Sequence, residues 1–264
     1  MIVDFHNHVF PDQLAARAVA SLVATSKNCY PPVHDGTVAG LVNNMDDWGI
    51  DVSVVLPVIT KQSQTKSINT WANSIASSRI VPFGGMYPHL DHYKEDIDYA
   101  VQLGMKGLKL HPEYQYFIID DDAMLPIYDY ALSKGLILLF HAGYDPGFPP
   151  PFKSTPKQFL TILKAMQGGT IIAAHLGGHD QWDDVEEYLV GTDIYLDTSM
   201  GFEYYSSEQF LRIVRNHGSD RILFASDSPW SNAGRELERL RSLPLTEEEA
   251  ENILGGNARR LLRM

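Results

Sequence analysis

Two histidines near the start of this sequence are placed where they could carry chemistry. His6 ends the apolar run MIVDFH, and His8 follows two positions later, after Asn7. Side chains two positions apart on a strand point to the same face, so both imidazoles can be aimed at one point. Such a pair suits a divalent metal such as zinc. A three-letter motif also recurs by chance, and two histidines satisfied within the core are the alternative.

Two residues far along the chain extend this pair into a set of metal ligands. His141 ends the run LILLFH, and Asp227 ends the run RILFASD. Three imidazoles and one carboxylate form a ligand set that zinc, manganese or iron accepts. A catalytic site also leaves a position for water, and Asp227 would accept the proton of that water. The alternative for Asp227 is a cap on a helix that follows Ser228 and Pro229.

Three more polar residues follow apolar runs. His175, in AAHLGG, predicts a catalytic imidazole that contacts the attacking water or polarises the substrate; a second-metal ligand and a structural core histidine are its alternatives. Lys109 and His111 lie two positions apart in KGLKLHPEYQ, and both are predicted to bind substrate. Lys109 has two other interpretations: a carbamylated bridge between two metals, or an ion pair with a carboxylate such as Glu113.

These residues can meet only if the segments that carry them converge. Eight short apolar runs occupy residues 1–6, 52–57, 80–85, 107–112, 136–143, 170–178, 193–199 and 221–227. Nearly continuous apolar character is typical of parallel strands that are buried on both faces. Because helical segments separate the runs, we expect an α/β protein, a single-domain (β/α)8 TIM barrel over residues 1–264. The functional groups then lie at the carboxyl ends of its strands.

Helical spacing predicts the segments between the strands. Residues 91–103, 122–133 and 206–216 repeat apolar side chains at helical spacing. Thr155 and Pro156 predict an N-cap followed by proline at the first helical position, and a last helix is expected after Leu245. His92 and His217 fall in expected helices and are predicted to be solvated, whereas His179 is predicted to be a loop residue.

Two segments depart from the alternation of strand and helix. Residues 9–49 form the longer one, and residues 144–156 form a stretch rich in glycine, proline and aromatic side chains. The second segment is too stiff for a flexible linker. It predicts either a loop that covers a pocket or a rigid surface loop.

Composition limits the classes of partner. The 264 residues carry a formal net charge of −12 without a basic stripe, which disfavours nucleic acid and anionic membranes as partners. Cys29 is the single cysteine, the start of the chain lacks a signal-peptide pattern, and no apolar run reaches the roughly 18–20 residues that span a bilayer. We therefore expect a soluble cytoplasmic protein that acts on a small molecule, with a homodimer as the commonest assembly.

Taken in order, the motifs resemble the amidohydrolase superfamily, and within it the amidohydrolase-related branch that includes aminocarboxymuconate-semialdehyde decarboxylase. The resemblance runs over nearly the whole chain, through DFHNH, GLKLHPEYQ, FHAG, AHLGG, FASDSPW and ILGGNARRLL. It implies a distorted TIM barrel and a divalent metal, most often zinc. Lys109 stands on the strand where other members carry a carbamylated lysine; in this branch that lysine need not be modified, so one ion is preferred over two.

The resemblance also implies a role for each matching residue. His6 and His8 correspond to the paired ligands of the first strand, and His141 corresponds to the ligand of the fifth strand. Asp227 corresponds to the ligand and proton acceptor of the eighth strand. His175 corresponds to the histidine that assists water activation.

Three functions compete on these residues. The first is a metal-dependent hydrolase that opens a small amide, lactone or ester-like bond with activated water. The alternative is a metal-dependent lyase, a decarboxylase or hydratase of a small carboxylic acid. A decarboxylase needs a carboxylate clamp, and Lys109 and Lys153 are the candidate cations because no arginine follows a run directly; this favours the hydrolase. A metal-free binding protein is the third, and the complete ligand set disfavours it.

Overall fold

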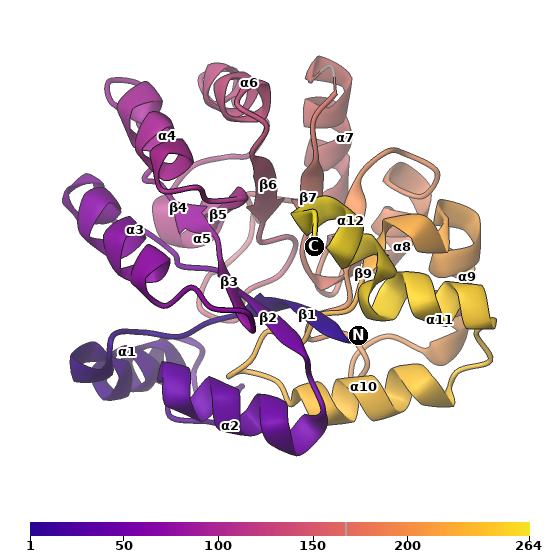
Figure 1. The fold of residues 1–264 in the computed structure, drawn as a ribbon. Coiled ribbons are helices and arrows are strands. Elements are labelled where there is room, and N and C mark those ends of the chain that lie inside the picture. The colour runs from indigo at the N-terminus through magenta and orange to yellow at the C-terminus, as the bar shows by residue number, and fades with distance from the viewer. Residues whose placement is uncertain (167) are drawn as a thin grey trace.

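Strands and helices alternate along the whole chain in the computed structural model, which describes residues 1–166 and 168–264 (Figure 1). The strands of the described part are β1 Val3–Asn7, β2 Val52–Val55, β3 Ile80–Pro82, β4 Gly84–Gly85, β5 Gly107–Leu110, β6 Ile137–Phe140, β7 Ile171–Ala173, β8 Tyr195–Asp197 and β9 Ile222–Leu223. Every pair of neighbouring strands is parallel, in the orders β1-β2-β3 and β4-β5-β6-β7-β8-β9. Each predicted run contains a strand, and the predicted third run contains two.

The two groups of strands form one barrel. β3 and β4 are the halves of the predicted third strand, divided at Phe83, whose backbone N–H still donates to Val55 O at 2.9 Å. At the other edge the Phe5 N–H donates to Phe224 O at 2.9 Å, and Asn7 pairs with Ser228 in a parallel bridge. These contacts join β1 to β9, so the predicted single-domain (β/α)8 TIM barrel is confirmed.

Helices surround the strands (Figure 1). Their bounds are α1 Asp12–Thr25, α2 Val38–Trp48, α3 Thr65–Ser74, α4 Tyr93–Gln102, α5 Pro112–Gln115, α6 Leu125–Ser133, α7 Pro156–Ala165, α8 Trp182–Tyr188, α9 Ser207–His217, α10 Ala233–Ser242, α11 Glu247–Glu251 and α12 Asn257–Leu262. Short 3-10 turns lie at Gln62–Gln64, His175–Gly177 and Ser219–Arg221, and a π-helical segment, Asn252–Gly256, joins α11 to α12. Among the helices of the described residues we find none with the length and hydrophobicity that spanning a bilayer would require.

The starts of α7, α9 and α11 are found where the sequence placed them, whereas the helices predicted from residues 91 and 122 begin at Tyr93 and Leu125. Thr155 caps α7 in a capping box with Gln158, and Pro156 is the first helical residue. The Ser206 hydroxyl accepts from the Gln209 N–H at the start of α9. Thr246 and Glu249 form a second capping box at α11. Each box satisfies backbone N–H groups that the first helical turn leaves without partners.

One prediction about a helical residue is wrong. His92 is exposed, as expected, but His217 at the end of α9 is buried. Its Nδ1 accepts from the Gly191 N–H at 3.2 Å, and its Nε2 donates to Ile194 O at 2.8 Å. Whether a helical residue is exposed depends on the face of the helix that carries it. His217 lies on the face toward the barrel, where its ring forms hydrogen bonds with the backbone of the loop before β8.

Apolar side chains fill the barrel and the space between the barrel and the helices. The inner cluster contains Phe5 and Phe83, whose rings meet edge to face at 5.7 Å between centroids. The larger outer cluster lies between strands and helices. A filled interior gives the strand ends a rigid base, which is why groups attached there can be held in fixed geometry.

On most strands, regular alternation of side chains places polar residues inside the barrel at the carboxyl ends of the strands. On β6 Ile137 and Leu139 belong to the inner cluster, and His141 continues their side. On β1 alternation from Phe5 alone would turn His6 outward. The register of β1 against β2 is irregular between Asp4 and Asn7, and His6 lines the cavity described below. The prediction that His6 faces inward is therefore confirmed. The cause is the irregular register of β1, which regular strand alternation would not have predicted.

Candidate active site

A cavity of about 580 Å³ opens at the carboxyl ends of the strands. Every residue predicted to act in the site lines it, namely His6, His8, Lys109, His111, His141, His175 and Asp227. These residues come from five strands or the segments directly after them, separated by most of the chain. The convergence that the sequence predicted is present in the structure.

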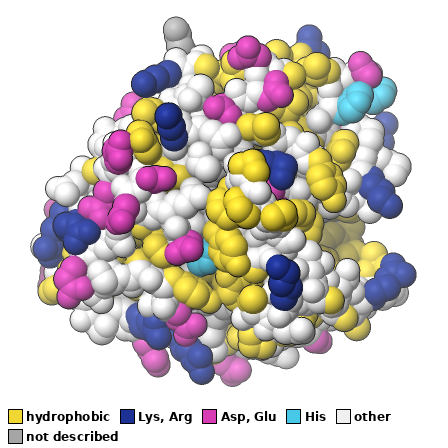
Figure 2. All heavy atoms as spheres, turned by 180° about the vertical axis from the view of Figure 1, so that it is seen from behind, with side chains coloured by type: hydrophobic (Ala, Val, Ile, Leu, Met, Phe, Trp, Pro, Cys, Tyr) yellow, Lys and Arg dark blue, Asp and Glu magenta, His cyan; other side chains and the backbone are white. Residues whose placement is uncertain are grey.

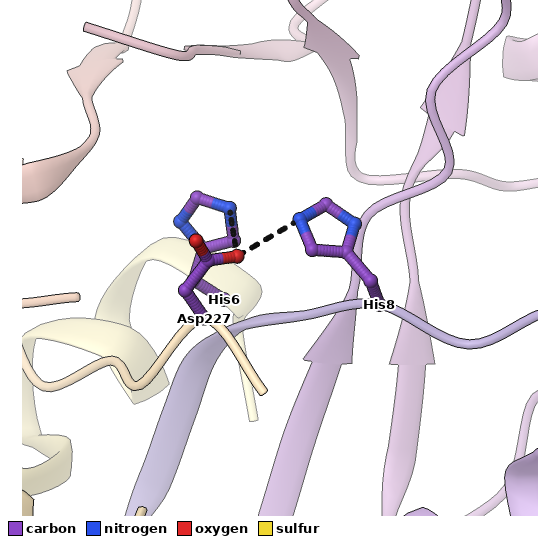
Figure 3. Close-up of side chains that lie close together, drawn as sticks. All are labelled: His6, His8 and Asp227. Carbon is purple, nitrogen blue, oxygen red and sulfur yellow. Dashed lines mark ion pairs between the residues drawn. The ribbon is translucent and has the colours of Figure 1, made fainter. Parts of the chain in front are cut away.

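Three of the four predicted metal ligands form a compact group (Figure 3). His6, His8 and Asp227 each offer one ligand atom, and these atoms lie within 4.8 Å of one another. His8 Nε2 lies 3.1 Å and His6 Nε2 lies 3.4 Å from the same Asp227 oxygen, Oδ1.

The hydrogen bonds around this group fit a cation. His8 Nδ1 donates to Leu56 O at 2.7 Å, which leaves the lone pair of the His8 ring on Nε2, toward Asp227. Asp227 Oδ1 is buried and has no hydrogen-bond partner among the described residues. A lone pair that faces a carboxylate oxygen at this distance is repulsive unless a positive charge lies between them. The donor set and the orphaned oxygen therefore fit a divalent metal.

Two further contacts fix His6. Its Nδ1 lies 2.9 Å from Asp197 Oδ2, and its Nε2 lies 2.9 Å from Lys109 Nζ. Asp197 also accepts backbone N–H groups of His175 and Ser199, each at 3.0 Å. The Asp197 carboxylate thus orients His6 and the segment of His175 together, in the manner of a carboxylate behind a metal-binding histidine. Sequence reasoning missed Asp197, although it lies in the run DIYLDTS and is the last residue of β8.

His141, the fourth predicted ligand, lies outside the group of His6, His8 and Asp227. It belongs to a second group with His111 and Asp145, and its ring stacks on that of His111 at 4.1 Å with 7° between the planes. Its Nδ1 lies 3.0 Å from His175 Nε2, and its buried Nε2 has no hydrogen-bond partner in the described part of the chain. Ligation of the same ion by His141 stays a prediction. His111, His141 and Asp145 each offer a ligand atom within 4.8 Å of the others, so this second group could also hold a metal ion.

His175 is buried between His141 and the segment after β8. Its Nδ1 lies 2.9 Å from Ser199 Oγ, a hydroxyl that also lies 3.2 Å from His6 Nδ1. The backbone φ is 56° at His175 and 69° at Asp227, in the left-handed region that non-glycine residues seldom adopt. Strain of this kind persists where the surrounding structure holds a functional side chain in place. Ser199 is a second residue that sequence reasoning missed.

Burial sets the protonation of the site. Desolvation lowers the pKa of His6, His141 and His175 well below the ordinary histidine value, so these imidazoles are neutral and able to bind a metal. Desolvation raises the pKa of Asp227. It also lowers the pKa of Lys109 to about 8, with the Asp227 and Asp197 charges acting against the change.

The alternative in which Glu113 holds Lys109 is wrong. Glu113 forms its ion pair with Lys153 and also accepts the Lys153 backbone N–H at 2.8 Å. Lys153 is thereby neutralised, and it is not among the residues that line the cavity. Lys109 is 1% exposed and, within the described residues, has no ion pair within 4.0 Å. His111 Nε2 lies 3.5 Å from Asp145 Oδ2.

The outer part of the cavity is mostly apolar. Leu14, Leu22, Ile68, Trp71 and Trp230 line it. Figure 2 shows hydrophobic side chains gathered around the middle of one face of the molecule, with a histidine visible among them.

The two long irregular segments both reach this part of the cavity. Tyr30 lies in the first, and Tyr144 and Pro146 begin the second, so the interpretation of residues 144–156 as part of a pocket wall is supported for its first residues. Arg17, on α1, also lines the cavity, and sequence reasoning missed it because it considered arginines at strand ends only.

His179 is both a loop residue and a wall of the cavity. Its Nε2 lies 3.3 Å from the Tyr30 hydroxyl, and its ring meets Tyr204 edge to face at 5.0 Å. Desolvation lowers its pKa to about 4. The loop assignment of His179 is confirmed. Its contact with Tyr30 joins the loop after β7 to the segment before α2.

Comparisons with known proteins agree with this fold. A family model described as amidohydrolase matches residues 3–264. No curated protein sequence matches the chain. A TIM-barrel protein of Bordetella bronchiseptica is 19% identical, with a TM-score of 0.80 and coverage of 99% of this chain and 98% of the other.

Two similar structures carry an activity in their names. 5-Carboxyvanillate decarboxylase from Sphingomonas paucimobilis is 16% identical, with a TM-score of 0.73 and coverage of 100% of this chain and 99% of the other. A dihydroxybenzoic acid decarboxylase from Polaromonas, with bound manganese and the inhibitor 2-nitroresorcinol, is 14% identical, with a TM-score of 0.74 and coverage of 99% and 96%. At these identities the likeness concerns the fold.

Proposed function

Because the chain belongs to the amidohydrolase family, whose model spans residues 3–264, we propose that it is a metal-dependent lyase that decarboxylates a small aromatic or unsaturated carboxylic acid. The observation that carries the proposal is Lys109, a buried amine beside the His6, His8 and Asp227 group with no carboxylate of its own among the described residues. The order of preference that the sequence favoured, hydrolase before lyase, is thereby reversed.

Lys109 supports a carboxylate substrate on electrostatic grounds. A buried charge is costly unless an opposite charge or hydrogen bonds compensate it. Lys109 Nζ lies 2.9 Å from His6 Nε2, and a metal would take the single lone pair of that nitrogen because Asp197 holds His6 Nδ1. The N–H donors of the Lys109 ammonium would then be available to a ligand. A substrate carboxylate at the floor of the cavity would satisfy them. Two of the similar structures are named as decarboxylases of aromatic acids, which supports the same class of substrate.

The metal would be held by His6, His8 and Asp227, and we propose His141 as the fourth ligand through its unpartnered Nε2. A bound divalent ion supplies a Lewis acid that holds substrate oxygens and draws electron density toward itself. We propose a single ion and keep zinc as the expected metal, with manganese or iron accepted by the same ligands. Manganese in a similar decarboxylase makes that metal the first to test beside zinc.

The chain's own residues account for the remaining steps. The bond between the carboxylate carbon and its neighbour breaks, carbon dioxide leaves, and the electron pair stays on the neighbouring carbon. That carbon must then take up one proton. Asp227 lines the cavity and can deliver this proton from Oδ2, because Oδ1 is the oxygen that faces the metal ligands His6 and His8. His175, whose Nε2 lies 3.0 Å from His141 Nδ1, would hold His141 in place. Trp71 and Trp230 line the outer part of the cavity, where their apolar side chains would limit the access of water.

Carbon dioxide release tests the proposal directly. Metal-loaded protein would be incubated with 2,6-dihydroxybenzoate and with 5-carboxyvanillate, each labelled with 13C in the carboxylate, and labelled carbon dioxide would be measured. Release should fall at least about a hundredfold in Lys109→Met, because the variant removes the cation without adding bulk. Lys157→Met, which alters an exposed lysine outside the cavity, serves as the matched control. Ring-opened acids from lactones, with no carbon dioxide from any aromatic or unsaturated acid, would overturn the proposal.

Hydrolysis of a lactone or ester-like bond is the second candidate. It is favoured by the position of Asp227 Oδ1, a buried proton acceptor between His6 Nε2 and His8 Nε2. In this function Asp227 would take a proton from water, and His175 would stabilise the developing charge. The same incubation with lactone substrates distinguishes the two functions by their products.

A further inference from the structure

One face of α1 lines the cavity and leaves a large apolar side chain exposed. Leu14, Arg17, Ala18, Ser21 and Leu22 repeat at the spacing of a single helical face, and all of them line the cavity. Leu14 is 43% exposed although it is large and apolar. Ile68 and Trp71 of α3 line the same space. We call these residues of α1 and α3 the outer wall.

The cavity is larger than a single-ring acid requires. Its volume is about 580 Å³, whereas a cavity of about 150 Å³ is enough to hold benzene. The strand-end groups occupy the inner end, so the remaining space lies against the outer wall. Its apolar side chains suit an apolar body that extends beyond the reacting carboxylate.

Arg17 adds a charge to this apolar wall. Among the described residues that line the cavity, Arg17 and Lys109 are the lysines and arginines. The acidic residues of the lining have other roles, since Asp227 is a proposed metal ligand and Asp145 Oδ2 lies 3.5 Å from His111 Nε2. Arg17 forms no ion pair within 4.0 Å in the part of the chain that the structure describes. The Arg17 side chain is solvent-exposed as well as part of the cavity lining, so its guanidinium is available to an anionic group in bidentate fashion.

We propose that the outer wall binds the non-reacting part of the substrate, an apolar body that ends in a second anionic group held by Arg17. The substrate is accordingly a dianion with one carboxylate at Lys109 and another at Arg17. This inference rests on the proposed function in one respect: the reacting carboxylate is taken to lie at the strand ends, beside Lys109. The chain's charge of −12 gives no general attraction for anions, so the two cations must supply the selectivity.

Matched pairs of acids test the inference through binding, without turnover. The metal-loaded protein would be titrated calorimetrically with naphthalene-2-carboxylate and naphthalene-2,6-dicarboxylate, and with biphenyl-4-carboxylate and biphenyl-4,4′-dicarboxylate for a longer span. In at least one pair the diacid should bind about threefold to fivefold more tightly than the monoacid, as expected for one ion pair with an exposed arginine. That ratio should fall to about one in Arg17→Gln and recover in part in Arg17→Lys.

Two further variants separate a specific contact from a general effect of charge. Arg235→Gln removes an arginine of α10 that does not line the cavity, and it should keep the diacid preference. Ala18→Trp fills the space beside the outer wall, so it should weaken both naphthalene acids more than benzoate. Equal affinity for diacid and monoacid in both pairs, or a preference that persists in Arg17→Gln, would overturn the inference.

The binding result is independent of the reaction. A diacid preference that depends on Arg17, without carbon dioxide release, would refute the proposed function and retain the substrate class. Release of carbon dioxide from monoacids at full rate, with no role for Arg17, would refute the inference and retain the function.

Discussion

His6 is the residue at which most contacts of the site meet. Its Nδ1 faces Asp197, its Nε2 faces Lys109 and Asp227, and Ser199 lies beside its ring. A ring held from both nitrogens cannot rotate, so its ligand atom keeps one direction. Rigid placement of this kind is what a metal site requires from the residues behind its ligands.

Removal of a proposed ligand should abolish metal binding. In His8→Ala and Asp227→Asn we expect metal affinity to fall by more than the roughly 10–100-fold that loss of a supporting residue costs. Metal content after dialysis and competition with a chromogenic chelator would measure the change. His92→Ala alters an exposed histidine and is the control. Full metal content in His8→Ala would show that the group is not the metal site.

The Asp197 carboxylate should act through His6 as a positioning group. Asp197→Asn replaces an acceptor by an amide at 2.9 Å from His6 Nδ1, which weakens the fixed tautomer of the ring. We expect a loss of about 10–100-fold in metal affinity with the fold retained. Asp193→Asn, whose side chain is 95% exposed, should change nothing. If the metal affinity of Asp197→Asn were unchanged, the Asp197 carboxylate would have a structural role only.

Among the elements, the strands place the chemistry and the helices shape the space above it. β5 and β6 carry Lys109 and His141 into the cavity by simple alternation, because Gly107 and Ile137 lie two and four residues earlier on the same sides. α1 and α3 add the outer wall. Reactive groups and selectivity thus come from different elements, so variants in α1 should alter selectivity without altering metal binding.

Phe83, between β3 and β4, allows a test of how much packing inside the barrel contributes to the stability of the fold. Phe83 is fully buried there and packs against Phe5. We expect Phe83→Ala to lower the free energy of unfolding by about 3–5 kcal/mol, through lost burial and the cavity that remains. Chemical denaturation would measure this change. Leu90→Ala, at a residue that is 49% exposed, should cost less than about 1 kcal/mol. A similar cost in both variants would contradict the role of Phe83 as interior packing.

For the molecule as a whole, one buried acid links stability to pH. Burial raises the pKa of Glu236 on α10 from 4.5 to about 7, and Ser231 is its hydrogen-bond donor at 2.8 Å. The folded protein therefore holds a proton on Glu236 between pH 4.5 and 7 that the unfolded chain releases. Stability contributed by this group is present below pH 4.5 and declines as pH rises to about 7.

Glu236→Gln should remove this dependence. The amide of the variant would stay neutral at every pH, so the variant should gain stability relative to the parent protein as pH rises from 4.5 to 7, by on the order of 2 kcal/mol. Thermal and chemical unfolding across that range would measure the difference. Glu238→Gln, a solvent-exposed acid of the same helix, is the control. A constant difference between parent and variant at all pH values would contradict the raised pKa.

The sequence by itself determined the barrel and most of the inner site. Apolar runs of strand length must be buried, parallel strands present their carboxyl ends at one edge, and residues that end such runs must therefore meet. This argument placed His6, His8, Lys109, His175 and Asp227 around one cavity. It also located the helix starts at Thr155 and Thr246, because capping is a local interaction.

Only the tertiary structure decided the contacts between segments that have no common pattern. It assigned Glu113 to Lys153, and it buried His217 against the loop before β8. It placed Arg17 in the cavity wall, although α1 lies in the irregular segment after β1. The physical reason is that local sequence fixes period and capping, whereas partner choice between distant side chains depends on how helices pack over the strand ends.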